Sequence, residues 1–94
     1  MKITGFIWLD EIIEKLNKKH HVHQYEIREV FLDRPKFYFV EKGHRNKENV
    51  YAALGKTIAG RFLIIFFVYK KNKSAFILSA RNMTGAERRK YEEK

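Results

Sequence analysis

Two arginines enclose the most apolar part of this sequence. Arg61 precedes the apolar run 62–69, and Arg81 closes the run that begins at residue 75. If the Lys-Lys-Asn-Lys segment 70–73 is the turn of a β-hairpin, the first residue of one strand lies beside the last residue of the next. Neighbouring like charges repel each other, so two adjacent guanidinium groups indicate an anion between them. The spacing therefore predicts that Arg61 and Arg81 hold a phosphate group.

Further cations are expected at the same end of the sheet, from the directions of the strands and the order of the chain. They are Lys36, Lys56, Arg88 and Arg89. Guanidinium groups at a site of phosphodiester attack stabilise the charge that develops on the phosphoryl oxygens. The alternative is that the arginines only solvate strand ends or pair with Glu87. The lysine-rich turn and the polar loop 42–49 are expected at the opposite end.

Three of the four histidines lie within residues 20–23. A metal site needs ligands that converge with a third or fourth donor, and adjacent histidines in a bend rarely converge. The acidic residues are scattered, so a two-metal nuclease site is not expected either. A histidine can instead act as a general base or acid, or be a polar residue in a helix-helix turn. If the chain cuts nucleic acid, we expect RNA cleavage without a metal or other cofactor, because the 2′-hydroxyl is a nucleophile already in place.

The chain is short, basic and free of cysteine. Its 94 residues allow one domain with a small core, and the lack of cysteine excludes disulfides and thiolate zinc sites. A net charge of +9 and a pI near 9.9 indicate a polyanionic partner: nucleic acid first, then an acidic protein or an anionic membrane. Simple solubility is the plainer explanation. We expect a cytoplasmic protein, since the start lacks a signal peptide and the longest apolar run is far below the roughly 20 residues of a membrane helix.

Hydrophobic periodicity places these residues on helices and strands. An apolar stripe of helical spacing follows Asp10, an acceptable N-cap, and a second helix over residues 24–32 ends before Pro35. Thr84 and Glu87 have the spacing of a capping box for a short C-terminal helix. Strand-like segments are 3–8, 37–40, 50–56, 62–69 and 75–80. The pattern predicts a single α+β domain over 1–94, with an N-terminal helical hairpin, a small antiparallel meander sheet and a short C-terminal helix.

Several short motifs occur in order along nearly the whole chain. They are Phe6-Ile7-Trp8 with Asp10, Lys19-His20 before Val22, Glu29-Val30-Phe31, His44 with Glu48, Leu54-Gly55, Gly60-Arg61, Ile77-Leu78-Ser79-Ala80-Arg81, and Glu87 with Tyr91. With these motifs the chain resembles the BrnT family of toxins from bacterial type II toxin-antitoxin systems, which have a RelE-like fold. The resemblance implies a small ribonuclease that cleaves cellular RNA and arrests translation. It also implies a BrnA-type antitoxin that holds the toxin inactive and binds DNA to repress the operon.

The chain departs from the family pattern at a few positions. His21 stands where the family reads Lys-His-Gly-Val, Lys47 stands where glycine is usual, and Val50 stands where arginine is usual. The last change removes an RNA or phosphate contact, so a weaker catalyst or a differently arranged site is open. The family pattern also favours His44, which the meander geometry places away from the arginine pair.

The hypothesis is a metal-independent endoribonuclease toxin. Arg61 and Arg81 hold the scissile phosphate, His20 is the general base or acid, and Tyr91, expected as an exposed ring on a polar helix, assists. The cations expected to follow the RNA backbone are Lys19, Lys56, Arg88 and Arg89. Two alternatives are a non-catalytic nucleic-acid-binding module, which uses the same cations for affinity alone, and a protein-interaction domain whose basic face binds an acidic partner.

Overall fold

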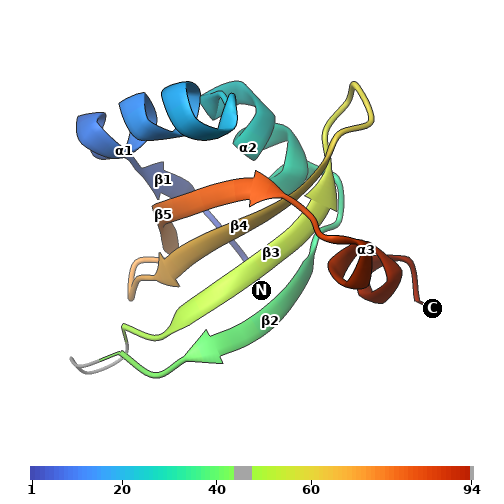
Figure 1. Ribbon diagram of the computed structural model, residues 1–94. Helices are drawn as coiled ribbons and strands as arrows, with labels where there is room; N and C mark the ends of the chain where they lie inside the picture. Colours follow the sequence, from blue (N-terminus) through green and yellow to red (C-terminus); the bar gives the residue numbers. More distant parts are fainter. Residues whose placement is uncertain (44–47, 94) are drawn as a thin grey trace.

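The structure is a computed structural model that describes residues 1–43 and 48–93. Its elements in chain order are strand β1 (Gly5–Ile7), helix α1 (Asp10–Lys15), π-helix η1 (Leu16–His20), helix α2 (Gln24–Leu32), strands β2 (Lys36–Glu41), β3 (Val50–Lys56), β4 (Phe62–Tyr69) and β5 (Ser74–Asn82), and helix α3 (Gly85–Glu92). Figure 1 shows α1 and α2 together along one side of the sheet, with α3 standing apart from them. The predicted α+β class, with helices before the antiparallel strands and a short helix after them, is confirmed. In the described part of the chain, no helix has the length and apolar character needed to cross a lipid bilayer.

The five strands form one sheet in the order β1-β5-β4-β3-β2. Strands β2 to β5 are an antiparallel meander, as predicted. Strand β1 pairs with β5 in the parallel direction, so the sheet is mixed and the prediction of a wholly antiparallel sheet is wrong. Only a tight turn imposes antiparallel pairing, and the connection from β1 to β5 passes through the helices and three other strands.

Strand β4 lies in the middle of the sheet and is buried from both sides. Leu63, Ile65 and Phe67 have no exposed surface and belong to the larger core under α1, η1 and α2. Ile64 points the other way and belongs to the smaller core under α3. This two-sided burial explains why the run is apolar without alternation.

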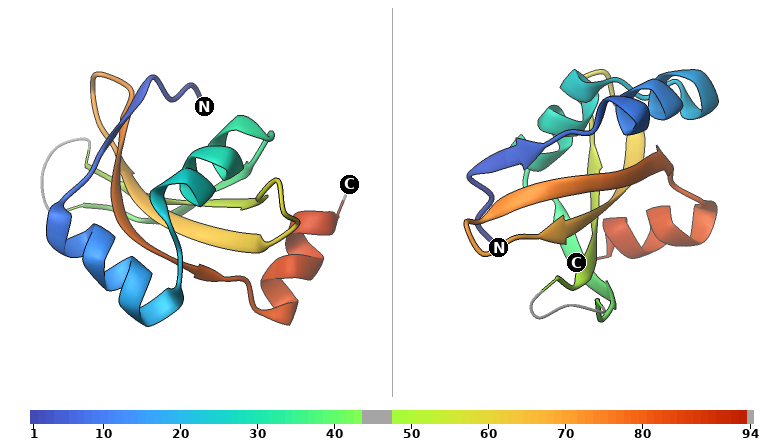
Figure 2. Two further views of the ribbon diagram at one scale, coloured as in Figure 1. Left: turned by 90° about the horizontal axis from the view of Figure 1, so that it is seen from above. Right: turned by 90° about the vertical axis from the view of Figure 1, so that its left-hand side faces the viewer.

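The two faces of the sheet differ in their helical cover. Helices α1 and α2 and the π-helix η1 pack on one face, whereas α3 packs on the other and has no buried residue. Figure 2 shows the strong bend of the strands and the separate positions of the two helical groups. Helix α2 approaches the sheet closely at Gly55, where an added Cβ would lie 2.8 Å from Cγ1 of Val30. A glycine at this position therefore lets the helix come down onto β3.

The first helix changes its winding before it ends. Helix α1 begins at Asp10 with Leu9 as its N-cap, so the expected cap residue lies one position inside the helix. The chain then continues as η1. This π-helix is capped at its C-terminal end by His21, which has φ 53° and ψ 38°. This left-handed conformation costs a residue other than glycine roughly 1–2 kcal/mol. It gives a physical reason for a glycine at this position in a Lys-His-Gly-Val pattern.

Strand β5 contains a β-bulge at Leu78. The register between β4 and β5 skips this residue, which has no partner across the ladder. One extra residue shifts the alternation of side chains between the two faces of a sheet. Ile77 and Ala80 consequently both belong to the larger core, and Arg81 faces α3.

Candidate functional site

Arg61 and Arg81 lie on opposite faces of the sheet. The Arg61 side chain reaches α2 on the face of the larger core. Arg81 is paired in register with Ile64, and its side chain reaches Glu87 of α3 on the other face. The prediction that the two guanidinium groups meet around one phosphate is therefore wrong. The physical reason is the bulge at Leu78, because without it Arg81 would face the larger core as Arg61 does.

Arg61 ties three segments together through its guanidinium group. Nη1 donates to the carbonyl oxygen of His21 at 2.7 Å and to the carboxylate of Glu26 at 3.2 Å. Nη2 donates to the carbonyl oxygen of His20 at 2.8 Å, and Nε donates to Oδ1 of Asn82 at 2.8 Å. Four of the five N–H groups are engaged in this way. The side chain holds the end of η1, the start of α2 and the end of β5 in place.

Arg81 forms a bidentate ion pair with Glu87. Nη1 and Nη2 donate to the two carboxylate oxygens at 2.8 and 2.9 Å, and Nη1 also donates to the carbonyl oxygen of Asn82 at 3.1 Å. The hydrogen bonds from Arg81 lower the pKa of the Glu87 carboxyl to about 2, and the same contact raises the pKa of Arg81. Glu87 also accepts from the backbone N–H of Thr84, which completes the predicted capping box. The ion pair with Glu87 that the alternative expects is therefore present, and it engages only part of the Arg81 guanidinium group.

The two arginines differ in the donors that they leave free. In Arg81, Nε–H and one Nη2 proton make no hydrogen bond within the described residues, and both lie on one edge of the guanidinium plane. The Arg81 side chain is 36% exposed. Arg61 keeps one N–H group, and its side chain is 26% exposed. Of the two, Arg81 alone can bind a phosphate with two parallel hydrogen bonds while keeping its present contacts.

Helix α3 and the strands beneath it place cations over aromatic rings. The closest are Cζ of Arg88, 3.9 Å from the ring centroid of Phe62, and Nζ of Lys90, 4.1 Å from that of Tyr38. We call this surface the α3 face; its cations are Lys36, Lys56, Arg81, Arg88 and Lys90. The four predicted strand-end cations all lie at this end of the sheet, but the Arg61 side chain is on the opposite face. Interleaved cations and rings are typical of surfaces that bind single-stranded nucleic acid.

Tyr91 is packed against the sheet. Its ring lies 6.0 Å from that of Phe62 at an interplanar angle of 75°, and it joins the smaller core. The expectation of a free ring on a polar helix is therefore wrong, because this side chain is what fastens α3 to β4. The Tyr91 hydroxyl makes no hydrogen bond with the residues that the structure describes.

The other predicted site residues lie around the same end of β5. Lys19 is exposed in η1, and Arg89 is exposed on α3. His20 is half-buried at the end of η1, and its carbonyl oxygen accepts from Arg61, which also reaches Asn82, the residue after Arg81. His44 and Lys47 lie outside the described residues.

The edge of β5 beside Arg81 carries no strand in the described structure. Strand β1 pairs only with Ser74, Ala75 and Phe76 at the start of β5. The later part of β5 therefore has an open edge between the α3 face and the end of η1.

No group of three or more His, Asp or Glu side chains within residues 1–43 and 48–93 is arranged to hold a metal ion. His20, His21 and His23 follow one another through the turn between η1 and α2. Their backbone conformations differ, with His21 left-handed and His23 extended as the N-cap of α2. The turn therefore separates these side chains.

Glu26 and Asn82 are the site residues that the sequence reasoning missed. The Glu26 side chain is only 10% exposed, and it accepts from Arg61 and from the backbone N–H of His23. A signal for it exists in the sequence: Val22, Glu26 and Val30 follow each other at intervals of four residues, the spacing of one helical face. A carboxylate in such an apolar row requires a buried partner. No comparable pattern points to Asn82.

The fold and the α3 face define a small basic α+β protein with a surface suited to anions. A family described as "Ribonuclease toxin, BrnT, of type II toxin-antitoxin system" matches residues 8–87. The chain belongs to this family, and it is a ribonuclease toxin of a type II toxin-antitoxin system. A comparison with curated proteins finds no match for the chain. Family membership favours the ribonuclease hypothesis over both non-catalytic alternatives.

Proposed function

We infer that this toxin is a metal-independent endoribonuclease that holds the scissile phosphate at the free edge of the Arg81 guanidinium group. The observation that carries the proposal is the pair of unused N–H groups on a partly exposed arginine. Two coplanar donors match two phosphoryl oxygens. Glu87 fixes the plane of the guanidinium group in advance, so the side chain loses little orientational entropy when the transition state forms.

The reaction that fits this arrangement is attack by the 2′-hydroxyl of RNA on the adjacent phosphorus. The bond from phosphorus to the 5′-oxygen breaks, which leaves a 2′,3′-cyclic phosphate and a 5′-hydroxyl. One proton leaves the 2′-hydroxyl and one reaches the departing oxygen, so the step needs no further reactant. His20 is the proposed base or acid, acting around the open edge of β5, and Tyr91 with its unbonded hydroxyl is the proposed auxiliary group.

Glu87 does not fit the role of general base. Arg81 lowers the pKa of its carboxyl to about 2, which makes the carboxylate a weak proton acceptor at neutral pH. Its two oxygens are also already occupied by the guanidinium group and by the cap of α3. Glu87 is therefore a positioning residue for Arg81.

The RNA backbone is proposed to cross the α3 face. The cations assigned to it are Lys56, Arg88 and Arg89 on this side, and Lys19 of η1 beyond the edge of β5. Arg88 and Lys56 both lie over the ring of Phe62, and Arg81 lies 5.6 Å from the ring of Phe66. Aromatic rings can stack on unpaired bases, so a single-stranded RNA segment suits this surface better than a duplex.

Arg61 is proposed to position other site residues and not to bind the phosphate itself. Its guanidinium group carries the ends of η1 and β5, which are the segments that present His20 and Arg81. A phosphate would have to displace the His20, His21 or Glu26 contacts to be held by two N–H groups of Arg61. The proposal therefore assigns Arg61 a positioning role and reserves the phosphate for Arg81.

The biological setting proposed for this activity follows from the family. A toxin of this class acts on cellular RNA in the cytoplasm and arrests translation, within a RelE-like fold. A BrnA-type antitoxin is proposed to neutralise it and to bind the operator DNA, so that DNA contact is indirect.

The test uses a short RNA and its copy with a single 2′-deoxy nucleotide at the cleaved position, both incubated with the full chain in chelator. We expect cleavage of the RNA with a cyclic phosphate product and an intact deoxy copy. Cleavage of the deoxy copy, or complete loss of cleavage in chelator, would contradict the mechanism.

A further inference from the structure

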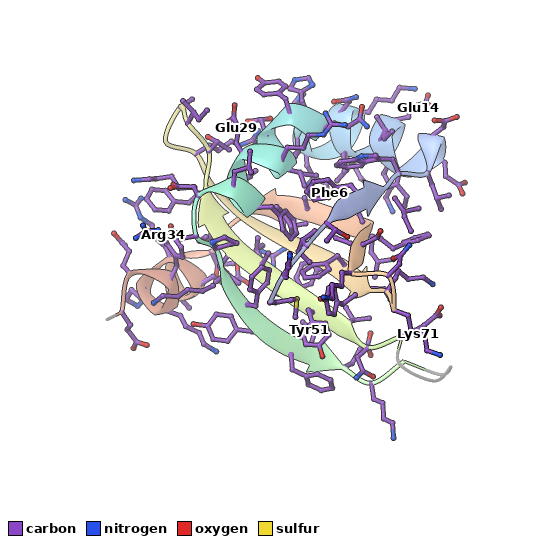
Figure 3. The ribbon with its side chains drawn as sticks, turned by 180° about the vertical axis from the view of Figure 1, so that it is seen from behind. Phe6, Glu14, Glu29, Arg34, Tyr51 and Lys71 are labelled. Atoms are coloured by element: carbon purple, nitrogen blue, oxygen red, sulfur yellow. The ribbon has the colours of Figure 1, made fainter. Side chains whose placement is uncertain are left out.

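A groove of about 630 Å³ lies on the face opposite Arg81, between the segment that leads into β1 and the end of α2. Its apolar lining consists mainly of Ile3, Phe6, Phe31, Leu32, Pro35 and Phe37. Figure 3 views this face, with Phe6 and Arg34 labelled. The volume lies in the range of roughly 300–1,000 Å³ that is typical of ligand clefts.

The floor of the groove is made of packed aromatic rings, and its rim is exposed. The ring of Phe31 lies 5.1 Å from that of Phe6 and 5.3 Å from that of the fully buried Phe67, both nearly perpendicular to it. Leu32, the last residue of α2, is 85% exposed at the rim. A floor of packed aromatic rings beneath an exposed leucine is the arrangement of an anchor site for apolar side chains.

Two arginines give the groove its charge. Arg28 precedes Leu32 by one helical turn on α2, and its Cζ lies 5.6 Å from the ring of Trp8. Arg34, the residue before Pro35, has φ 50° and so lies in the left-handed region. Neither arginine has an ion pair in the described structure, and no carboxylate lines the groove. The site therefore offers apolar contacts between two unpaired positive charges.

We propose that this groove binds an amphipathic, acidic segment of the antitoxin, whose apolar side chains contact the phenylalanine floor and whose carboxylates pair with Arg28 and Arg34. Charge complementarity carries the choice of partner, since the chain has a net charge of +9 and two of its unpaired cations line the groove. The inference rests on the proposed antitoxin partner and does not depend on the RNA site.

A second copy of the chain is a less suitable occupant. Two molecules of charge +9 repel each other, and a self-complementary contact would bring the two arginines of each copy together. RNA is also less suitable, because the floor is apolar and the cluster of cations over rings at α3 lies on the other face. Self-association through this face remains a measurable outcome of the test.

The position of the groove bears on how the antitoxin neutralises the toxin. The groove is formed by residues of the larger core, and Arg81 lies on the opposite face. A segment in the groove anchors the antitoxin without covering Arg81. Blocking of the RNA site must then come from another part of the antitoxin.

The first test compares two apolar side chains of the same size and similar exposure. Leu32→Asp removes the anchor at the rim and adds a charge that repels an acidic segment, whereas Ile58→Asp makes the same change at the 88% exposed Ile58 in the β3-β4 turn. Affinity of the full-length chain for the purified antitoxin is measured by calorimetry. We expect Leu32→Asp to raise Kd at least about tenfold and Ile58→Asp to leave it within about twofold.

The second test reverses charge. Arg34→Glu is compared with Lys15→Glu, an exposed position on α1 away from the groove. We expect at least about a tenfold rise in Kd for Arg34→Glu, growing smaller at high salt, and little change for Lys15→Glu.

The inference is overturned if both groove variants bind the antitoxin as the wild type does, or if the two controls lose as much affinity. Loss of self-association in Leu32→Asp, seen by sedimentation of the toxin alone, would assign the groove to a second copy and also overturn it. RNA cleavage by Leu32→Asp without antitoxin is expected at the wild-type rate. If the wild type does not cleave RNA, the proposed RNA site is wrong. The affinity measurements still test whether the groove binds the antitoxin.

Discussion

Each face of the sheet carries an arginine-glutamate pair that links a strand end to a helix, and these two pairs differ in burial and in the number of N–H groups that the arginine engages. Arg61 with Glu26 lies on the face covered by α1, η1 and α2, and the two side chains are 26% and 10% exposed. Arg81 with Glu87 lies under the short helix α3, where the side chains are 36% and 24% exposed. The first guanidinium group has four N–H groups engaged and the second has three.

This difference shows that the residue types of an ion pair do not decide its role. Arg61 donates four of its five N–H groups to a buried carboxylate, two backbone carbonyl groups and an asparagine side chain. Its pair with Glu26 therefore fixes three segments of the chain. The Glu87 pair orients its arginine and leaves one edge open to an anion. Removing a cation should therefore affect stability on the first face and catalysis on the second.

Arg61→Ala should be the most destabilising change. It leaves Glu26 buried without its cation and removes the donors for the carbonyl groups of His20 and His21, which should lower the free energy of unfolding by about 3 kcal/mol. Arg81→Ala, with a more exposed partner, should cost about 1 kcal/mol. Urea denaturation at pH 7 measures both, and equal losses would remove the distinction between the pairs.

Glu87→Gln tests how the second pair depends on pH. The pKa of Glu87 is lowered from 4.5 to about 2, so the pair stabilises the fold fully above about pH 4.5, and this stabilisation is lost as the pH falls towards 2. We expect the variant to be less stable than the wild type by about 1 kcal/mol at pH 7, with most of this difference gone at pH 2. Urea midpoints at several pH values check this, and a constant difference across the range would contradict it.

His21→Gly should stabilise the first face. His21 has φ 53°, which glycine adopts without steric cost, and its carbonyl contact with Arg61 needs no side chain. We expect a gain of up to about 1 kcal/mol in the free energy of unfolding, after the larger backbone entropy of glycine in the unfolded chain is offset. His23→Gly, at φ −102°, is the control and should bring no gain.

Lys18→Ala should have the smallest effect. Lys18 pairs with Glu14 one turn away on the helix, and both side chains are largely exposed. Such a pair contributes less than about 0.5 kcal/mol. A loss as large as that of Arg81→Ala would mean that exposure does not separate the pairs in this protein.

Much of the fold follows from the sequence because local signals agree with the tertiary environment. The predicted ranges 24–32, 50–56 and 62–69 match α2, β3 and β4, and the Thr84 capping box starts α3 as expected. The direction of β1 does not follow, since no short turn sets it. The change from α1 to the π-helix η1 also leaves no pattern in the sequence that sets it apart from an ordinary helix end.

The sequence predicts which cations lie near the site but not the face of the sheet on which each one lies. Strand directions correctly place Lys36, Lys56, Arg61 and Arg81 at one end of the sheet. The pairing of Arg61 with Arg81 failed because it assumes unbroken alternation along β5, and the bulge at Leu78 reverses the face of every residue after it. An irregularity of one residue in a strand is set by packing on both faces, which the sequence of that strand alone does not contain.

The most direct measurement compares Arg81→Lys with Arg61→Lys in RNA cleavage, at a temperature where both variants are fully folded by circular dichroism. Lysine keeps the charge but loses the two coplanar donors. The account predicts that Arg81→Lys lowers kcat/KM by about 100-fold or more with RNA affinity within about threefold, and that Arg61→Lys loses less than about tenfold. Wild-type cleavage by Arg81→Lys, or an equal loss in both variants, would contradict the assignment of the phosphate to Arg81.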